Sequence, residues 1–438
     1  MRALWVALFA SAILFAGLGK SPLWDRDETE YAQAALEMQQ NGEWLIPTLE
    51  GRPFLEKPIL LYWATRLSYK AFGVLTCLAA VFLGGSLYGT RAGFWAGMSL
   101  ASMFLFAGGF RLLLTDPLFV FFSTMAFAFY ARQALLPAYL SIGLAVLAKG
   151  PIGFFPAAVF ALYEWSRGKF PFKHAAWGLG SAALAAPWFL YSFSHARAET
   201  STFFLYDNLA RLFQSFEGHD GPAFYYVIVL ALGVLPWTFL LASALKKNWL
   251  LRSARKEPLS GADLLLALWA LSIFILFSMS ATKLPHYMFP VLPALACLVG
   301  KYVSEDPQRE KNAWKICGGT LIFFLALIHF VLPAVDRYRV MKPIGVALKE
   351  NAPADAKVYG YFVSEPSLFF YGGRLFPLIE EGTLDDLLSQ KGPVFVITKE
   401  SRFHDVPASV PHKTLARADG FSENGGKMTL RLLSNERP

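Results

Sequence analysis

Residues 3–44, ALWVALFASAILFAGLGKSPLWDRDETEYAQAALEMQQNGEW, place a strongly apolar run directly before a cluster of four carboxylates. The run at residues 3–18 follows Arg2, as in a signal peptide. No small-x-small cleavage site leading into a polar mature chain follows it, and apolar runs continue along the sequence. We therefore expect residues 3–18 to be a retained membrane span, with the acidic cluster at residues 25–30 in the first loop beyond it.

The composition is that of a membrane protein. Of the 438 residues, 55% are hydrophobic, 16% aromatic and 16% charged, whereas soluble domains have about 25% charged residues. The net charge of +8 would suit a nucleic-acid partner, but the basic residues lie between apolar runs, where they orient membrane spans. We therefore expect that nucleic acid is not a partner of this protein. The three cysteines lie within apolar runs and are interpreted as packing residues.

About eleven apolar runs are candidate spans, since a span needs about 20 apolar residues. They are residues 4–18, 74–88, 92–110, 118–130, 135–148, 152–163, 175–193, 223–245, 262–280, 290–303 and 316–335. Several are short, especially near residues 149–151, and such runs can tilt, pair as half-spans or merge. The count is therefore open by one or two.

Lysine and arginine set the predicted orientation. Basic residues gather in the loops at 167–173, 246–256 and 301–315. With eleven spans and the N-terminus inside, all three loops face the cytoplasm. The acidic cluster, Asp116 and the segments around residues 195–220 and 283–287 then face outward. This arrangement predicts a multi-pass membrane protein whose conspicuous polar residues gather on its outer face.

The last hundred residues differ in character. Residues 357–363, 393–398 and 428–433 have strand patterns, and residues 366–371 and 383–389 have short helical patterns. We predict two domains: an all-α polytopic membrane domain at 1–335 and a small periplasmic α/β domain at 336–438.

The first outer loop is too patterned for a floppy connection. Residues 29–40 put apolar side chains on one helical face, and residues 58–72 form a second amphipathic, aromatic-rich segment. Both are typical of helices that lie in the membrane interface. Between them, a proline-rich stretch presents Glu56 and Lys57.

Each outer polar residue also has an ordinary structural interpretation. Asp25 or Asp27 would cap the helix that follows, and Asp116 would cap the next span. Lys283 and Tyr287 would anchor a span at the membrane interface, and a lone His219 would be a surface residue. However, capping does not need four carboxylates, and an ionisable residue at a span end is a functional candidate.

These pieces together carry a resemblance. DETEYAQAALEMQQNGEWLIPTLEGRPFLEKPILLYW at residues 27–63 resembles the first outer loop of the GT-C fold glycosyltransferases that use polyprenyl-phosphate sugars. Within these, it is most similar to the aminoarabinose lipid A transferases and next to the protein O-mannosyltransferases. LTDP, KGPIG, EGHDGPAFYYVIVLALGVLPW and KLPHYMFPVLPALA follow in the family's order. The likeness covers the membrane part, and the tail resembles the family's C-terminal domain only loosely.

The resemblance implies transfer of a sugar from a polyprenyl-phosphate donor, with inversion, at the outer membrane face. The acceptor would be a lipid similar to lipid A or, alternatively, a protein Ser or Thr; the other expected partners are membrane lipids. Asp27, with Glu28 beside it, matches the catalytic carboxylate, and Asp116 matches a second acidic position. A transporter is the contrasting hypothesis, but transporters bind near the midplane between repeats, and no repeat is visible here.

The same resemblance assigns binding residues. Lys57 and Tyr287 match phosphate-contacting positions, and Lys283 and His286 are neighbours. A further pair, Glu56 and His219, matches positions that hold a structural metal in the aminoarabinose transferases, which makes zinc or magnesium a candidate cofactor.

Two ligands do not complete a tetrahedral site, and a third from His404 or His412 is left open.

Glu30 departs from the family, which often has arginine there, and this puts the identities of sugar and acceptor in doubt.

Overall fold

The computed structural model describes the chain except residues 24–25, 67–68, 171, 216–219, 223, 248–256, 364, 404–409, 423–425 and 436–438. The chain divides into two compact units. Unit 1 comprises Met1–Ala16, Asn41–Thr48 and Pro53–Leu325, and unit 2 comprises Gly17–Gln40, Leu49–Arg52 and Ala326–Pro438. The predicted domain division at residues 335 and 336 stays a prediction, because compactness does not test independent folding.

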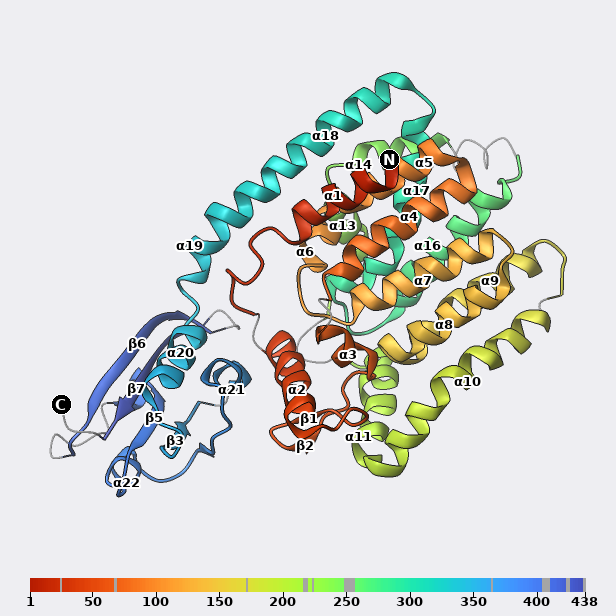
Figure 1. The fold of residues 1–438 in the computed structure, drawn as a ribbon. Coiled ribbons are helices and arrows are strands. Elements are labelled where there is room, and N and C mark those ends of the chain that lie inside the picture. Colours follow the sequence, from red (N-terminus) through yellow and green to blue (C-terminus); the bar gives the residue numbers. More distant parts are fainter. Residues whose placement is uncertain are drawn as a thin grey trace. The chain divides into compact units, whose positions relative to one another are not determined.

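Unit 1 is a helical assembly (Figure 1). Its α-helices are α1 (Arg2–Leu14), α3 (Leu60–Arg66), α4 (Ala71–Tyr88), α5 (Thr90–Ser102), α6 (Phe104–Gly109), α7 (Asp116–Ala131), α8 (Leu135–Lys149), α9 (Phe155–Ser166), α10 (Phe172–His195), α11 (Arg197–Thr202), α12 (Arg211–Phe213), α13 (Tyr225–Gly233), α14 (Thr238–Leu245), α16 (Gly261–Met279), α17 (Leu292–Ser304) and α18 (Pro307–Ala326). Shorter 3-10 or π turns are η1 (Gly150–Phe154), η2 (Phe203–Ala210) and η4 (Pro285–Val291).

The chain is a helical membrane protein by the length and composition of these helices. Among the described residues, five stretches can cross a bilayer, and α13 with α14 would add a sixth. The five are Ala71–Tyr88, Leu135–Ser166, Gly261–Met279, Pro285–Ser304 and Pro307–Asp336. The predicted count of about eleven spans therefore stays a prediction, since shorter apolar helices such as α1 and α7 accompany the long ones.

Four expected runs take a form that hydropathy did not indicate. The run at 92–110 breaks at Met103, whose extended backbone separates α5 from α6. The run at 223–245 is bent by 115° between α13 and α14. The two runs from residue 135 to residue 163 form one stretch interrupted by η1, where Pro151 lacks the N–H that a continuous helix needs. Apolar content sets where membrane helices occur, but backbone chemistry sets where they break.

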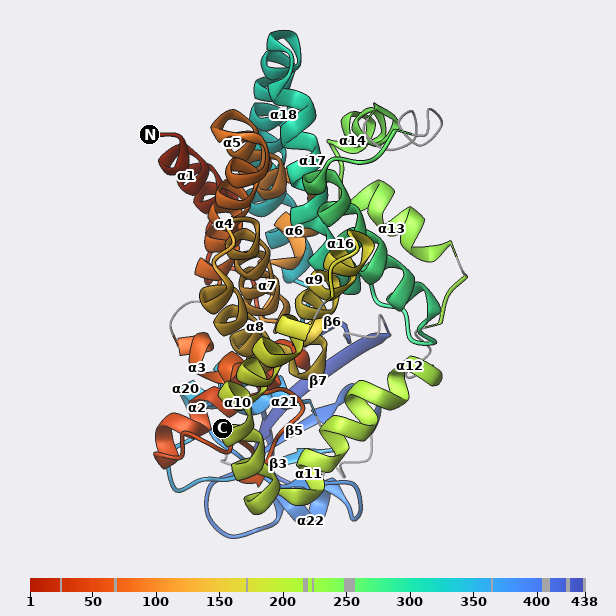
Figure 2. The ribbon, with the colours of Figure 1, turned by 90° about the vertical axis from the view of Figure 1, so that its right-hand side faces the viewer.

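Helix α5 packs against both α4 and α17 (Figure 2). Two glycines allow this close approach. A Cβ atom at Gly93 would lie 2.3 Å from the Val81 carbonyl oxygen of α4, and one at Gly300 would lie 2.3 Å from the Ala92 carbonyl oxygen of α5. Small residues let helix backbones come together where van der Waals packing drives association in lipid. The close packing of α4, α5 and α17 therefore requires glycine, which has no side chain, at positions 93 and 300.

We expect Gly300→Ala to destabilise unit 1 by about 1–3 kcal/mol, because the new methyl group would overlap the backbone of α5. Gly318→Ala in α18 is the matched control, since its Cβ would meet nothing within 4 Å and alanine favours a helix by about 0.5–1 kcal/mol. Thermal unfolding in detergent should show a lower midpoint for the first variant alone. Equal midpoints would contradict the close approach.

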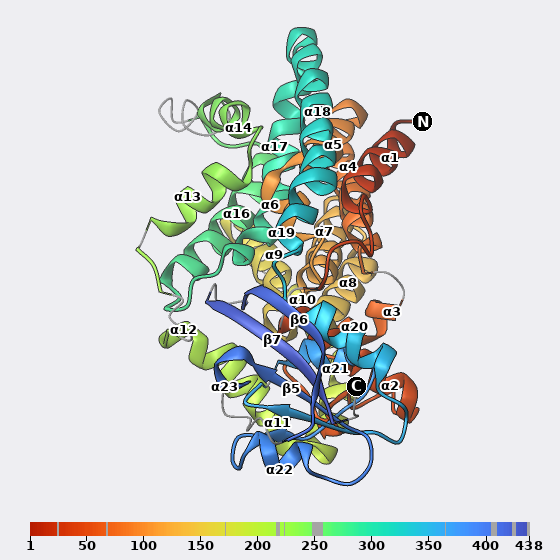
Figure 3. The same cartoon turned by 90° about the vertical axis from the view of Figure 1, so that its left-hand side faces the viewer.

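Unit 2 holds a five-stranded sheet in the order β4-β3-β5-β7-β6 (Figure 3). The strands are β3 (Lys357–Tyr361), β4 (Leu378–Ile379), β5 (Val394–Lys399), β6 (Lys413–Phe421) and β7 (Lys427–Ser434). Strand β3 pairs in parallel with β4 and β5, whereas β7 pairs antiparallel with β5 and β6.

Helices α20, α22 and α23 pack on this sheet, and unit 2 holds further helical elements. Together these elements are α2 (Asp27–Asn41, whose last residue falls in unit 1), α19 (Leu332–Asp336), α20 (Met341–Asn351), α21 (Pro366–Gly372), α22 (Leu384–Leu388), α23 (Glu400–Phe403) and the π turn η5 (Leu327–Val331). A two-stranded hairpin of β1 (Thr48–Leu49) and β2 (Arg52–Pro53) follows α2 in sequence. Successive side chains of a strand point to opposite faces, and β5 accordingly contributes Phe395 and Ile397 to one core and Val394 and Val396 to the other.

The predicted strands at 357–363, 393–398 and 428–433 are confirmed as β3, β5 and β7, and the predicted short helices as α21 and α22. Strand β6 and helix α20 were not predicted. Most of β6 is exposed or half-buried at the sheet edge, so its sequence lacks a continuous apolar pattern. Helix α20 contains Pro343 and Gly345 near its start, which obscured its helical periodicity.

Candidate functional site

A buried ion pair between Asp116 and Lys149 lies at the centre of the candidate site in unit 1. Asp116 begins α7 and is 2% exposed. Lys149 ends α8, and its Nζ lies 2.5 Å from Asp116 Oδ1. Helices α7 and α8 pack against each other and are joined by a three-residue turn. The start of one therefore meets the end of the other, and each charge has the sign that its helix terminus favours.

The η4 turn brings two predicted residues to this pair. Lys149 Nζ lies 5.9 Å from the centre of the Tyr287 ring. His286 interacts electrostatically with Asp116, Lys149, Lys57 and Arg211. Three residues predicted from separate parts of the sequence, Asp116, His286 and Tyr287, are thus brought together by α7 and η4.

The segment after α11 adds a second ion pair. Arg211 hydrogen-bonds the Tyr287 side chain, and its Nη2 lies 3.8 Å from Asp207. Burial raises the pKa of Asp207, while the positive charges of Lys57 and Arg211 act in the opposite direction. Three cations, Lys57, Lys149 and Arg211, therefore act on the groups around Tyr287. Each is paired with a carboxylate, and together they offer charged hydrogen-bond donors that suit an anionic ligand.

Lys283 supports the loop that carries these groups. Its Nζ donates to the carbonyl oxygens of Ser278 at 3.2 Å and Ser280 at 2.6 Å. The Ser280 hydroxyl in turn donates to the Arg211 carbonyl oxygen at 3.0 Å. These bonds connect the end of α16 to the turn at Arg211. The predicted substrate contact of Lys283 stays a prediction.

The metal hypothesis also stays a prediction. The carboxylate of Glu56 lies 3.8 Å from its neighbour Lys57, and His219 lies outside the described residues. In the part of the chain that the structure describes, no group of three or more His, Cys, Asp or Glu side chains is placed to hold a metal ion. His404 is also outside the described residues, and His412 contacts the Val410 carbonyl oxygen within unit 2.

The acidic loop belongs to unit 2. Helix α2 begins at Asp27, where the free N–H groups of the first turn favour a carboxylate. The Asp27 side chain is exposed, whereas Glu28 is only 5% exposed. The exposure of Asp27 makes it the better placed of the two to meet a substrate, and the roles of both residues stay predictions. Asp25 lies outside the described residues.

Further along α2, Glu37 connects the helix to the turn between β1 and β2. Its carboxylate accepts hydrogen bonds from the backbone N–H groups of Glu50 at 2.9 Å and Gly51 at 3.2 Å. Gln33 Nε2 donates to the same carboxylate at 3.0 Å. Burial, together with the negative charge of Glu37, raises the pKa of Glu50. Helix α2 is thus fixed to the β1–β2 turn by hydrogen bonds to Glu37.

Comparison with known proteins places this arrangement in context. No protein family profile matches the chain. The undecaprenyl phosphate-alpha-4-amino-4-deoxy-L-arabinose arabinosyl transferase of Yersinia enterocolitica is 30% identical over 351 residues, which are 73% of this chain and 62% of the relative. That of Edwardsiella ictaluri is 30% identical over 327 residues, which are 68% of this chain and 58% of the relative. The chain thus spans about three-fifths of the length of these curated relatives.

Solved structures share the fold. ArnT from Cupriavidus metallidurans, bound to undecaprenyl phosphate, matches with a TM-score of 0.81 at 17% identity, covering 99% of this chain and 98% of that chain. The chain is a homologue of the aminoarabinosyl transferases and has the GT-C fold. The oligosaccharyltransferase AglB of Archaeoglobus fulgidus is more distant, with a TM-score of 0.53 at 13% identity, covering 81% of this chain and 58% of that chain. The predicted resemblance to the aminoarabinose transferases and the predicted GT-C fold are confirmed.

Three residues of this GT-C site escaped the sequence reasoning. Lys149 stands in KGPIG, which the sequence indicates only as a family-like motif. Asp207 lies in η2 and Arg211 begins α12, and neither is part of a recognisable motif. A lysine beside Gly-Pro within an apolar run was a usable signal, because an intramembrane charge needs a partner.

We expect Lys149→Met to destabilise the protein by about 3–5 kcal/mol, because it leaves the buried Asp116 carboxylate without its cation. Lys149→Arg keeps the charge and is the control. The double variant Asp116→Asn/Lys149→Met should unfold at a higher temperature in detergent than Lys149→Met alone. Additive losses in the double variant would show that the two residues do not depend on each other.

Proposed function

We propose that this protein is an inverting glycosyltransferase that moves a sugar from a polyprenyl-phosphate donor to a lipid acceptor similar to lipid A. The observation that carries the proposal is the group of cations around Tyr287, found in the fold of a transferase whose solved structure is bound to undecaprenyl phosphate. The activities named for the curated relatives support the same reaction class.

The cation group suits the leaving group of this reaction. When the bond between the anomeric carbon and the phosphate oxygen breaks, a phosphate diester becomes a monoester and gains negative charge. Lys57, Lys149 and Arg211 would stabilise that charge, and the Tyr287 hydroxyl would donate a hydrogen bond to it. His286 and Lys283 are proposed neighbours of the same phosphate. Preorganised donors of this kind contribute more in the transition state, where the charge develops.

The acceptor needs a carboxylate. We assign Asp27, with Glu28 beside it, to position an acceptor phosphate or to take the proton from an acceptor hydroxyl. The acceptor oxygen then attacks the anomeric carbon opposite the departing phosphate, so the configuration inverts. Asp116 is proposed to keep Lys149 charged and directed toward the leaving group, since the two form an ion pair.

The acceptor class is assigned from the relatives. The aminoarabinosyl transferases are the similar sequences, and transfer to a protein Ser or Thr is the alternative. We also propose that the protein lies in the bacterial inner membrane with about eleven spans, and that the site and the domain at 336–438 face the periplasm.

Asp27→Asn should lower the rate of sugar transfer by about 100-fold or more, the range that a general acid or base contributes. Glu30→Gln, in the same turn of α2, is the matched control and should stay within a few-fold of the parent. The measurement is mass spectrometry of purified lipid A after incubation with undecaprenyl phosphate-linked aminoarabinose. Parent-like transfer by Asp27→Asn would remove this residue from the reaction.

The proposed orientation can be tested with thiol labelling, because the three native cysteines are buried. A cysteine at Lys20 should react with a membrane-impermeant maleimide in spheroplasts of a bacterium that expresses the protein. A cysteine at Lys256 should react only after the membrane is permeabilised. The reverse pattern would invert the topology, and equal labelling of both positions in intact spheroplasts would refute it.

A further inference from the structure

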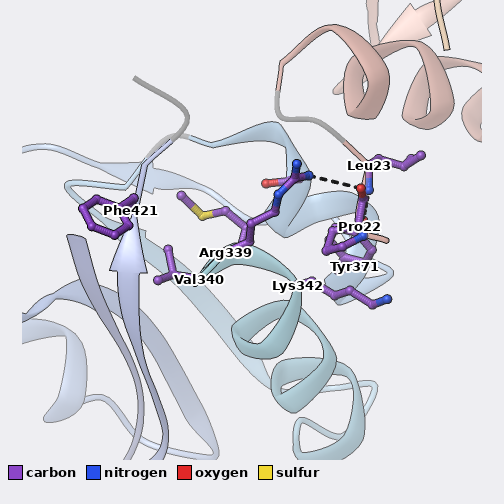
Figure 4. A pocket seen from close by; sticks show the side chains of 9 residues that line it. Pro22, Leu23, Arg339, Val340, Lys342, Tyr371 and Phe421 are labelled. Carbon is purple, nitrogen blue, oxygen red and sulfur yellow. Dashed lines mark hydrogen bonds between the residues drawn. The ribbon is translucent and has the colours of Figure 1, made fainter. Parts of the chain in front are cut away.

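The segment that leads into the acidic loop is held by the C-terminal part of unit 2. The Leu23 N–H donates to the Tyr371 hydroxyl oxygen at 2.7 Å, and Arg339 Nη1 donates to the Pro22 carbonyl oxygen at 3.2 Å. Figure 4 shows both contacts. Both partners of each bond lie in the same compact unit. Residues 22 and 23, four to five positions before Asp27, are thus attached to the fold by their backbone.

The two residues that hold this segment are themselves anchored. Arg339 Nε lies 3.3 Å from Asp336, and the Arg339 backbone forms a bridge with Phe421 at the end of β6. The Phe421 N–H also donates to the Tyr338 carbonyl oxygen at 3.0 Å. Tyr371 is part of α21, and α21 packs on α20. The position of the segment therefore depends on the sheet and on the helices that cover it.

A third contact lies earlier in the same segment. Gly17 has a left-handed φ of 66°, and a Cβ atom there would lie 2.6 Å from Ile328 Cγ2. The chain thus runs from Gly17 to Leu23 along residues of the last third of the sequence. Arg26 also has a left-handed φ of 58° directly before α2. Such a conformation in a residue other than glycine persists when its surroundings determine it.

We infer that Tyr371 and Arg339 are positioning residues that set where Asp27 is presented, so that the C-terminal domain is a working part of the transferase. The inference rests on the proposed role of Asp27. It has a physical reason: a shift of about 1 Å in a reacting group can lower a rate by up to about 100-fold. Neither residue touches the reacting atoms in this role; both act through the backbone of residues 22 and 23.

Two reciprocal variants remove the same hydrogen bond from opposite sides. Tyr371→Phe deletes the acceptor oxygen, and Leu23→Pro deletes the N–H donor without any change in the C-terminal domain. Tyr361→Phe is the matched control, because its hydroxyl donates to the Gly382 carbonyl oxygen in the same unit. Both reciprocal variants should lower kcat by about tenfold or more, with the KM for the polyprenyl donor unchanged. The control should keep both constants.

A spin label on a cysteine at Lys20 reports the attachment independently of activity, since Lys20 is exposed and the native cysteines are buried. Its mobility in the full-length protein in nanodiscs should rise in Tyr371→Phe and Leu23→Pro and stay unchanged in Tyr361→Phe. A mobile label with parent-like kcat would overturn the positioning role, and an unchanged label would overturn the attachment. If the parent transfers no sugar, the proposed function fails, and the label still decides whether the segment is attached.

Discussion

The cost of leaving a charge unpaired in a low-dielectric environment is the constraint on which unit 1 depends. Asp116 is almost fully buried, so its carboxylate needs a cation, and Lys149 supplies one from the neighbouring helix. The pair requires α7 to begin where α8 ends, which the antiparallel packing of the two helices provides. Gly150, with its left-handed φ of 80°, and Pro151, which lacks an N–H, interrupt the helix at this point and end α8 at the lysine. Backbone chemistry thereby places the cation where the buried carboxylate needs it.

The same requirement organises the charges further out. Arg211 interacts with both Asp207 and Tyr287, while its own carbonyl oxygen accepts from Ser280. A cation held in this way loses little freedom when it meets an anion, which is the benefit of preorganisation. The carboxylates of Glu56, Asp207 and Asp116 beside the three cations also reduce the repulsion among them before a phosphate binds. The arrangement can therefore bind an anion without first rearranging its charges.

Sequence patterns predicted the class and much of the content of the molecule, because lipid demands long apolar runs and strands alternate their faces. They did not predict the break at Met103 or the bend between α13 and α14, since hydropathy averages over the residues that cause them. For the site, the outer-loop reasoning selected Asp116, His286 and Tyr287, which the fold brings together. It missed Lys149 and Arg211, because the residue that pairs with a given charge is determined by the three-dimensional fold and cannot be read from local sequence.

Unit 2 extends this reasoning from side-chain charge to backbone position. The acidic cluster lies directly after a segment whose carbonyl and N–H groups bond to Arg339 and Tyr371, residues more than 300 positions later in the chain. Local sequence determines that α2 begins at Asp27 and that Glu37 bonds it to the β1–β2 turn. It does not determine where the first residue of α2 lies in the fold, which requires contacts between residues far apart in the sequence. The position of the exposed carboxylate at the start of α2 therefore depends on the C-terminal part of unit 2 as well as on its own local sequence.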